Sequence, residues 1–215
     1  MTVYWNDSTS HGWALAVDFG TSNTAAAVRR PDGQVRILRL SPDADQMPSC
    51  VLALPEGLRV GEAASRSALL APEAFERTPK VRLGEPVIAL GERRWAPGEL
   101  VAAVLRHVVH HAGRVIGGQP PEAVVLTHPA DWGGLRQREL HEAAARAGLP
   151  RVHLVPEPVA AAAWYLRARR LADGQRVAVF DFGGGTCDVA VLRACLLYTS
   201  PSPRDLSTSR MPSSA

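Results

Sequence analysis

The stretch Val177-Ala-Val-Phe-Asp-Phe-Gly-Gly-Gly-Thr-Cys-Asp-Val-Ala-Val191 joins two apolar segments through an acidic residue and three glycines. This pattern predicts two β-strands connected by a tight turn. Gly183 to Gly185 carry no Cβ, so the backbone of the turn can bring bare N–H groups close to an anion such as a phosphate. Asp181 and Thr186 flank the glycines and add a carboxylate that can face a metal ion and a hydroxyl group. For this stretch taken alone, a glycine-rich turn without a ligand is the alternative.

A second stretch near the N-terminus repeats this arrangement. Trp13 to Val17 predicts a short strand, Asp18-Phe-Gly-Thr-Ser-Asn-Thr24 interrupts it, and Ala25 to Val28 predicts the next strand. Asp18-Phe19-Gly20 matches Asp181-Phe182-Gly183, and an Ala-Val pair follows each at the same offset. Two such units indicate two related lobes, each offering a loop to one nucleotide between them.

The composition is that of a globular protein with little charge bias. The 215 residues are 46% hydrophobic and 21% charged, enough to bury a sizeable core. A formal net charge of +3, with scattered basic residues, argues against nucleic acid as a partner. We expect a cytoplasmic protein, because no apolar stretch has membrane-spanning length and the N-terminus lacks the pattern of a signal peptide. The three widely spaced cysteines agree with a reducing compartment.

Lys80 is the only lysine among the 24 basic residues. A chain that otherwise uses arginine has a lysine at the one place where a compact, mobile ammonium group can be needed in place of a planar guanidinium. Chance survival of one lysine is the alternative interpretation.

Between the two repeated units the pattern predicts alternating strands and helices. We expect strands at 35–40, 48–54, 87–90 with 93–95, 122–127 and 151–155, and helices at 60–70, 97–116, 135–147 and 159–171. The helix at 97–116 carries His107, His110 and His111, for which we expect surface or packing roles, because no carboxylate or cysteine joins them in a metal-binding pattern. Glu157 in Pro156-Glu-Pro158 is expected at the N-terminus of the last helix, either as a site residue or as an ordinary acidic residue of a first turn.

Five segments carry a family resemblance. Asp18 to Thr24 resembles the first phosphate loop of the actin-like ATPases, Val179 to Val189 resembles the second, and Val155-Pro-Glu-Pro-Val-Ala-Ala-Ala162 resembles the helix connecting the two lobes. Thr78-Pro-Lys-Val-Arg-Leu-Gly84 and Leu126-Thr-His-Pro-Ala130 are similar to segments of the heat-shock 70-kDa (Hsp70) chaperone family. The resemblance implies an α/β, ribonuclease H-like fold of the actin-like ATPase type.

The resemblance also implies site residues and ligands. Asp18 and Asp181 would hold a hydrated Mg²⁺ through water, and Lys80 would orient the attacking water at the γ-phosphate of ATP. Glu157, with Asp188 as a further candidate, would order metal-bound water. Two loops would hold the phosphates, through Gly20, Thr21 and Ser22 and through Gly183, Gly184, Gly185 and Thr186. The implied catalytic set is Lys80, Glu157, Asp181 and Thr186.

These roles amount to positioning and electrostatic stabilisation, which is most of what phosphoryl transfer requires of a protein. The implied activity is Mg²⁺-dependent ATP binding and hydrolysis by an Hsp70-like chaperone, with client peptides and co-chaperones as partners through parts absent here, and with no nucleic acid or membrane. Cys187 stands where the family usually has an aromatic or apolar residue, so we expect it to pack in the core.

We expect residues 1–12 to be a flexible leader and 13–194 to be a partial nucleotide-binding domain, with lobe I at about 13–158 and the start of lobe II at about 159–194. Residues 195–215 lack periodicity and are rich in serine and proline, which predicts a disordered tail. They resemble a translated sequencing-library adapter, with a natural tail as the alternative. Because adenosine-binding residues would follow the second loop, we expect this chain to bind ATP weakly or not at all.

Two other classes share the phosphate loops. A filament-forming cell-shape protein of the actin-like superfamily has both loops but no evident need for the segment around Lys80. A small-molecule kinase of the same superfamily would need an acceptor pocket that the pattern does not identify. A P-loop or dinucleotide-binding enzyme is disfavoured, because no Gly-Lys-Ser/Thr and no glycine fingerprint opens a helix.

Overall fold

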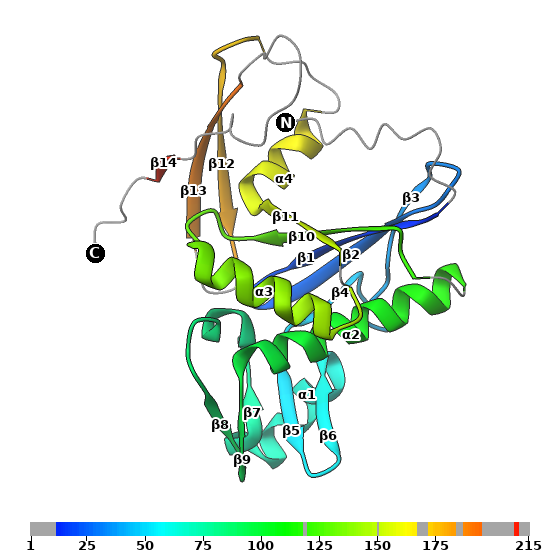
Figure 1. Ribbon diagram of the computed structural model, residues 1–215, viewed down its shortest axis with the longest axis vertical. Helices are drawn as coiled ribbons and strands as arrows, with labels where there is room; N and C mark the ends of the chain where they lie inside the picture. Colours follow the sequence, from blue (N-terminus) through cyan, green and yellow to red (C-terminus); the bar gives the residue numbers. More distant parts are fainter. Residues whose placement is uncertain are drawn as a thin grey trace.

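The computed structural model describes residues 12–117, 120–149, 151–166, 172–183 and 187–194 and the backbone of 209–210, but not the side chain of Cys187. Its architecture is α/β, built on a main sheet of mixed strand direction (Figure 1). The strand order is β11-β10-β1-β2-β3, and β4 also pairs with β2. These strands are β1 Ala14–Phe19, β2 Asn23–Arg29, β3 Val35–Ile37, β4 Gln46–Pro48, β10 Ala123–His128 and β11 Val152–Pro156.

The strand directions follow from the connections. β1, β2 and β3 are antiparallel neighbours joined by short turns, whereas β1, β10 and β11 are parallel. Parallel neighbours need a crossover, which is supplied by α2 (Pro97–Ile116) before β10 and by α3 (Gly134–Arg146) before β11. The parallel arrangement therefore brings the carboxyl ends of β1, β10 and β11 to one edge of the sheet.

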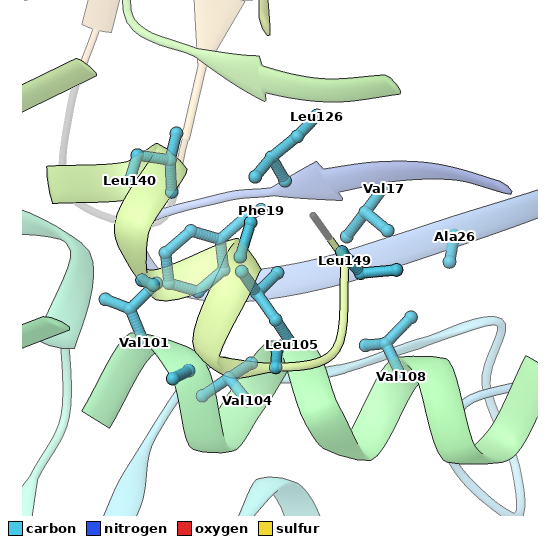
Figure 2. Close-up of a cluster of buried hydrophobic side chains, with 14 of the residues drawn as sticks. Val17, Phe19, Ala26, Val101, Val104, Leu105, Val108, Leu126, Leu140 and Leu149 are labelled. Atoms are coloured by element: carbon cyan, nitrogen blue, oxygen red, sulfur yellow. The ribbon is translucent and has the colours of Figure 1, made fainter. Parts of the chain in front are cut away.

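The main core lies between the sheet and the helices α2 and α3. Side chains alternate along β1, so Leu15, Val17 and Phe19 are buried while Ala16 and Asp18 face the other side. Figure 2 shows Phe19 near Leu140 of α3 and Val17 near Leu149, with apolar residues of α2 on the same side of the sheet. Burial of such side chains contributes about 1.5–3 kcal/mol each to the free energy of folding. This core therefore stabilises the hairpin of β1 and β2.

A second group of short elements lies below the main sheet in Figure 1. It contains β5 (Val51–Leu54), β6 (Gly57–Val60) and β7 (Phe75–Glu76) in one sheet, the hairpin of β8 (Ile88–Leu90) and β9 (Arg93–Trp95), and α1 (Gly61–Ser67). Short 3-10 helices join them at Ala68–Leu70, Pro72–Ala74 and Pro79–Arg82, and the last of these, η3, carries Lys80.

The remaining elements lie on the opposite side of the main sheet (Figure 1). Helix α4 (Glu157–Tyr165) follows β11, and β12 (Arg176–Phe182) and β13 (Cys187–Arg193) form an antiparallel hairpin beside it. A small cluster that includes Val159, Ala162 and Leu192 joins the helix to the hairpin. The two-residue β14 (Ser209–Arg210) pairs with β13.

The structure confirms several predicted elements. The helix at 97–116 forms as expected, and the hairpin before it forms with its first strand beginning at Ile88, one residue later than expected. Gly117 ends the helix with a φ of +93°, a value that favours glycine. The hairpin around Gly183 is present as the paired strands β12 and β13. No helix in the described ranges is both long and apolar enough to cross a membrane.

Other boundaries differ from expectation for identifiable reasons. Strand β1 continues through Asp18 to Phe19, because Asp18 pairs with Ala25 in the ladder. The segment 48–54 divides into β4 and β5, and only 35–37 of the expected strand at 35–40 is a strand. This β3 is exposed, contrary to the half-buried pattern expected of it, and the burial falls on Leu38 and Leu40 just after it.

The helices also begin and end differently in detail. The helix expected at 60–70 ends at Ser67 and continues as a 3-10 turn. Helix α4 begins at Glu157, two residues earlier than expected, because the proline at position 158 fits the first turn of a helix, where its missing N–H costs nothing. This earlier start makes Glu157 the first helical residue.

Candidate functional site

Three candidate residues meet where the parallel strands end. Asp18 is the penultimate residue of β1, Thr127 is the penultimate residue of β10, and Glu157 follows β11 directly. In α/β sheets, ligands bind beyond the carboxyl ends of parallel strands. The topology therefore places chemistry-bearing side chains at the edge where a ligand is expected.

Asp18 is oriented by a neighbour that the sequence analysis did not identify. The Thr127 hydroxyl donates a 2.6 Å hydrogen bond to Asp18 Oδ1, since an ionised carboxylate can only accept. Thr127 is buried, whereas Asp18 is exposed on the same face of the sheet. One carboxylate oxygen is thereby held by the protein, and Oδ2 keeps its accepting capacity for a ligand. No local pattern in the sequence marks Thr127 for this role, because its partner Asp18 lies 109 residues away in the chain.

Lys80 is buried beside this edge. Its side chain is 2% exposed and forms an ion pair with Glu157. Its Nζ also lies 5.7 Å from the centroid of the Phe19 ring and 5.6 Å from that of the Trp132 ring. A buried ammonium group is costly unless it is paired, and two aromatic faces add cation–π attraction. The only lysine of the chain is thus held in place by a carboxylate and two rings.

The carboxyl of Glu157 is close enough to other charges for them to influence its ionisation. Burial raises the pKa of Glu157, Lys80 opposes this increase, and Asp18 and Asp181 add to it. Asp18 belongs to the first repeated unit and Asp181 to the second, so both units direct a carboxylate at the same group. Four residues that the resemblance singles out from distant parts of the chain, Asp18, Lys80, Glu157 and Asp181, are therefore neighbours.

Two cavities border this group. A cavity of about 160 Å³ is lined by the carboxylate residues Asp131, Glu157, Asp181 and Asp188 together with apolar residues. A second, mostly apolar cavity of about 420 Å³ is lined in part by Asp18, Thr127, Glu157 and Asp181. Glu157 and Asp181 line both cavities. The acidic lining offers oxygen ligands, which hard cations such as Mg²⁺ prefer.

Within the described ranges, no three His, Cys, Asp or Glu side chains form a group that could bind a metal ion directly. The carboxylate lining of the smaller cavity fits a hydrated Mg²⁺, because this ion usually keeps several of its waters when one or two carboxylates bind it. His107, His110 and His111 all belong to helix α2.

The first predicted phosphate loop is a tight turn between β1 and β2. The Gly20 N–H donates a 3.0 Å hydrogen bond to the Asn23 carbonyl. A Cβ at Gly20 would lie 2.4 Å from that same carbonyl oxygen, so only glycine fits. Thr21 and Ser22 form the tip of the turn, and Ser49, which the sequence analysis did not single out, bonds to the loop from behind.

The second predicted loop is only partly described. Gly183 follows the last residue of β12, while Gly184, Gly185 and Thr186 lie outside the described residues. Asp188 pairs with Asp181 across the hairpin. The side chain of Cys187, expected in the core, also lies outside the described part.

Comparison with known proteins gives consistent matches. A family model described as "Hsp70 protein" matches residues 76–195, more than half of the chain. The "Chaperone protein DnaK" of Thermotoga maritima is 31% identical over 182 residues, which covers 84% of this chain and 30% of that protein. The protein of the same name from Elusimicrobium minutum is 36% identical over 184 residues, covering 83% and 29% respectively. The chain thus spans about 30% of the length of the curated relatives that it matches.

Proposed function

This chain belongs to the Hsp70 family, and we propose that it forms the phosphate-facing and metal-facing side of a Mg²⁺-ATP site in a nucleotide-dependent chaperone. Family membership implies the actin-like ATPase fold, of which this chain contains the first lobe. One observation carries the proposal, namely the ion pair of Lys80 and Glu157 with Asp18 and Asp181 close enough to shift the pKa of Glu157.

Asp18 and Asp181 are the proposed contacts to the hydrated metal. They come from equivalent positions of the two hairpins, and each carboxylate can accept hydrogen bonds from metal-bound water. When bound, Mg²⁺ neutralises phosphate charge and polarises the phosphoryl oxygens. Thr127 keeps Asp18 in one orientation for this role through its 2.6 Å hydrogen bond.

Lys80 and Glu157 are the proposed chemical pair. The Lys80 ammonium can donate hydrogen bonds to a γ-phosphate oxygen and to the attacking water, because it has three donors and only one is needed for Glu157. The Glu157 carboxylate can orient a water molecule through its second oxygen. Burial of the Lys80 side chain to 2% exposure strengthens these interactions by excluding bulk water.

The phosphates would be held by the tips of the two loops, at Gly20, Thr21 and Ser22 and at 183–186. N–H groups and hydroxyls at these positions are the donors that bind phosphate oxygens. This part of the proposal follows from the paired hairpins and from the resemblance of both loops to those of actin-like ATPases.

The remaining roles follow from the family and stay proposals. For the full-length protein we propose ATP hydrolysis, client peptides and co-chaperones as partners, and a cytoplasmic location; this chain spans about 30% of the DnaK relative from Thermotoga maritima. We propose that these 215 residues alone bind Mg²⁺-ATP only weakly. Isothermal titration tests this expectation, and micromolar affinity would contradict it.

Mn²⁺ can stand in for Mg²⁺ in a test of the metal site. In the ¹⁵N-labelled full chain, Mn²⁺ should broaden the amide signals of β1 and β12 near Asp18 and Asp181. Asp18→Asn should weaken this effect severalfold, because an amide is a poorer acceptor than a carboxylate. Glu92→Gln, at the distant tip of the β8–β9 hairpin, is the matched control and should change nothing. Equal broadening in Asp18→Asn and in the unmodified chain would contradict the metal role of Asp18.

The role of Lys80 needs an active protein. In a full-length protein that carries this chain, Lys80→Ala should lower the single-turnover rate of ATP hydrolysis by at least about 100-fold, since positioned groups of this kind contribute that much. An unchanged rate would remove Lys80 from the chemistry.

A further inference from the structure

A buried chain of hydroxyl groups lies behind the loop between β1 and β2. Ser49 Oγ donates a 2.8 Å hydrogen bond to the Gly20 carbonyl, and Thr24 Oγ1 lies 2.9 Å from Ser49 Oγ. The Ser49 N–H also donates to the Ser22 carbonyl at 2.9 Å. Ser49 and Thr24 are both fully buried, with 0% exposure. Ser49 therefore holds two carbonyls of one four-residue turn.

The direction of these bonds follows from the number of protons. A carbonyl can only accept, so the single hydroxyl proton of Ser49 is directed at Gly20. The bond between the two hydroxyls must then be donated by Thr24 and accepted by Ser49. The chain runs from Thr24 to Ser49 to Gly20, and each hydroxyl proton in it has a defined acceptor.

This arrangement determines where the next N–H group points. The peptide unit between Gly20 and Thr21 is planar, and the described residues contain no cis peptide bond. In a trans peptide the carbonyl and the following N–H point in opposite directions. Because Ser49 holds the Gly20 carbonyl on the inner side of the loop, the Thr21 N–H must point to the outer side.

The outer side of the loop has N–H donors for which the described residues offer no acceptor. Neither the Thr21 N–H nor the Ser22 N–H donates a hydrogen bond to any residue that the structure describes. The turn is closed from behind by the bond from the Gly20 N–H to the Asn23 carbonyl. The loop thus presents N–H groups that have no acceptor among the described residues, in an orientation that is set from the buried side.

We propose that Ser49 is a positioning residue, which orients the Gly20–Thr21 peptide so that the Thr21 N–H is presented to a phosphate oxygen. The inference rests on the proposed nucleotide site and assigns to it a residue that contacts no ligand. Donors that are held in position before binding lose less conformational freedom when the ligand arrives. Thr24 supports Ser49 by donating to its hydroxyl oxygen.

Two measurements on the full 215-residue chain test this role. Amide hydrogen exchange at Gly20 reports whether the turn stays closed, and the shift of the Thr21 amide signal during titration with Mg²⁺-ATP reports phosphate binding even at millimolar affinity. Ser49→Ala should accelerate Gly20 exchange and weaken ATP binding by about fivefold each, the effect of one hydrogen bond. Thr24→Val should have a smaller effect in the same direction, because the bond from Ser49 to Gly20 remains.

Ser41→Ala is the matched control. Ser41 is also a buried serine, but its hydroxyl has no hydrogen-bond partner among the described residues, so its removal should change neither measurement. Exchange and affinity within twofold of the unmodified chain in Ser49→Ala would overturn the inference. Loss of ATP affinity with an unchanged unfolding midpoint would support positioning over a general effect on stability.

The two proposals can fail separately. If the Thr21 amide of the unmodified chain does not respond to Mg²⁺-ATP, the proposed nucleotide site on this chain is contradicted. The exchange rate of Gly20 in Ser49→Ala then still decides whether Ser49 holds the loop, since that measurement needs no ligand.

Discussion

The two hairpins that carry the repeated Asp-Phe-Gly sequence have the same register and different surroundings. Asp18 pairs with Ala25, and Asp181 pairs with Asp188, seven residues on in each case. The phenylalanine after each aspartate differs in burial between the two hairpins. Phe19 is 0% exposed, whereas Phe182 is 75% exposed. Local sequence therefore sets the hairpin and its register, while burial depends on what packs against it.

The helices account for this difference. The first hairpin lies in the main sheet, with α2 and α3 covering the face that Phe19 occupies (Figure 2). The second hairpin contacts α4 on one face, through residues such as Val179 and Leu192. Its other face carries Phe180 and Phe182, which are largely exposed to solvent in the described structure. The same motif is thus a core element in one place and a partly covered ribbon in the other.

Truncating the two phenylalanines should give the largest contrast. Phe19→Ala is expected to lower the free energy of unfolding by about 4 kcal/mol, because it empties a packed site between the sheet and two helices. Phe182→Ala should change it by less than about 0.5 kcal/mol, since an exposed ring loses little on truncation. Urea unfolding followed by circular dichroism measures both. Similar losses in the two variants would show that the second hairpin is also packed.

Removing the charge of Glu157 should have the next largest effect. Asp18 and Asp181 bring the two hairpins into electrostatic contact with this residue. Glu157→Gln leaves the Lys80 ammonium buried without its counter-charge, so we expect a loss of about 3 kcal/mol in unfolding free energy at pH 7.

A surface ion pair provides the control for this variant. Glu62 pairs with Arg66 at 3.6 Å on the exposed face of α1, and Glu62→Gln should cost less than about 0.5 kcal/mol. Thermal unfolding at neutral pH compares the two variants. Equal losses would mean that the Lys80–Glu157 pair contributes no more than an exposed one.

The smallest expected effect is on the pH dependence of stability. It comes from His128, the last residue of β10, the strand next to β1 of the first hairpin. Burial lowers the pKa of His128, Lys80 lowers it further, and the hydrogen bond to the Pro129 carbonyl opposes this. The pKa of His128 in the folded chain is thus below its unfolded value of 6.5. Above pH 6.5 the ring is neutral in both states, and the stability that depends on a neutral His128 is fully present. This stability is lost as the pH falls through the folded pKa, because the buried ring must then take up a proton. Lowering the pH from 7 to 5 should thus destabilise the chain through His128.

His128→Gln isolates this contribution. The variant should lose less stability than the unmodified chain over the same pH range, by on the order of 1 kcal/mol. The raised pKa of Glu157 acts in the opposite direction, but it is present in both proteins and largely cancels in their difference. Urea unfolding at several pH values gives the comparison, and parallel pH profiles would exclude His128 as a pH-sensitive group.

Much of the fold could be predicted because periodicity survives in the long elements. Helix α2 has apolar residues at helical spacing between a proline and a glycine, and the structure matches its predicted bounds. The bounds of short strands were harder to predict, because they depend on the strands with which they pair and not on the local sequence pattern. The segment 48–54 is an example, since β4 pairs with β2 and β5 pairs with β6.

The candidate site shows the same division. Asp18, Asp181, Lys80 and Glu157 stand out in the sequence by repetition, by rarity or by position at a helix start. Thr127 and Ser49 do not stand out, because the role of each hydroxyl depends on the oxygen atom that accepts its hydrogen bond. These acceptors belong to residues that are 109 positions from Thr127 and 29 positions from Ser49, so no local pattern could reveal either role.

The sequence by itself determined the two Asp-Phe-Gly hairpins, the long helix and the family, because these depend on local geometry and on ordered motifs. Only the tertiary structure decided that Lys80 lies between two aromatic rings against Glu157, and that Ser49 holds the loop at Gly20. The physical reason is that hydrogen bonds, ion pairs and burial act over a few ångströms in space. The fold brings such partners together from segments that are remote along the chain.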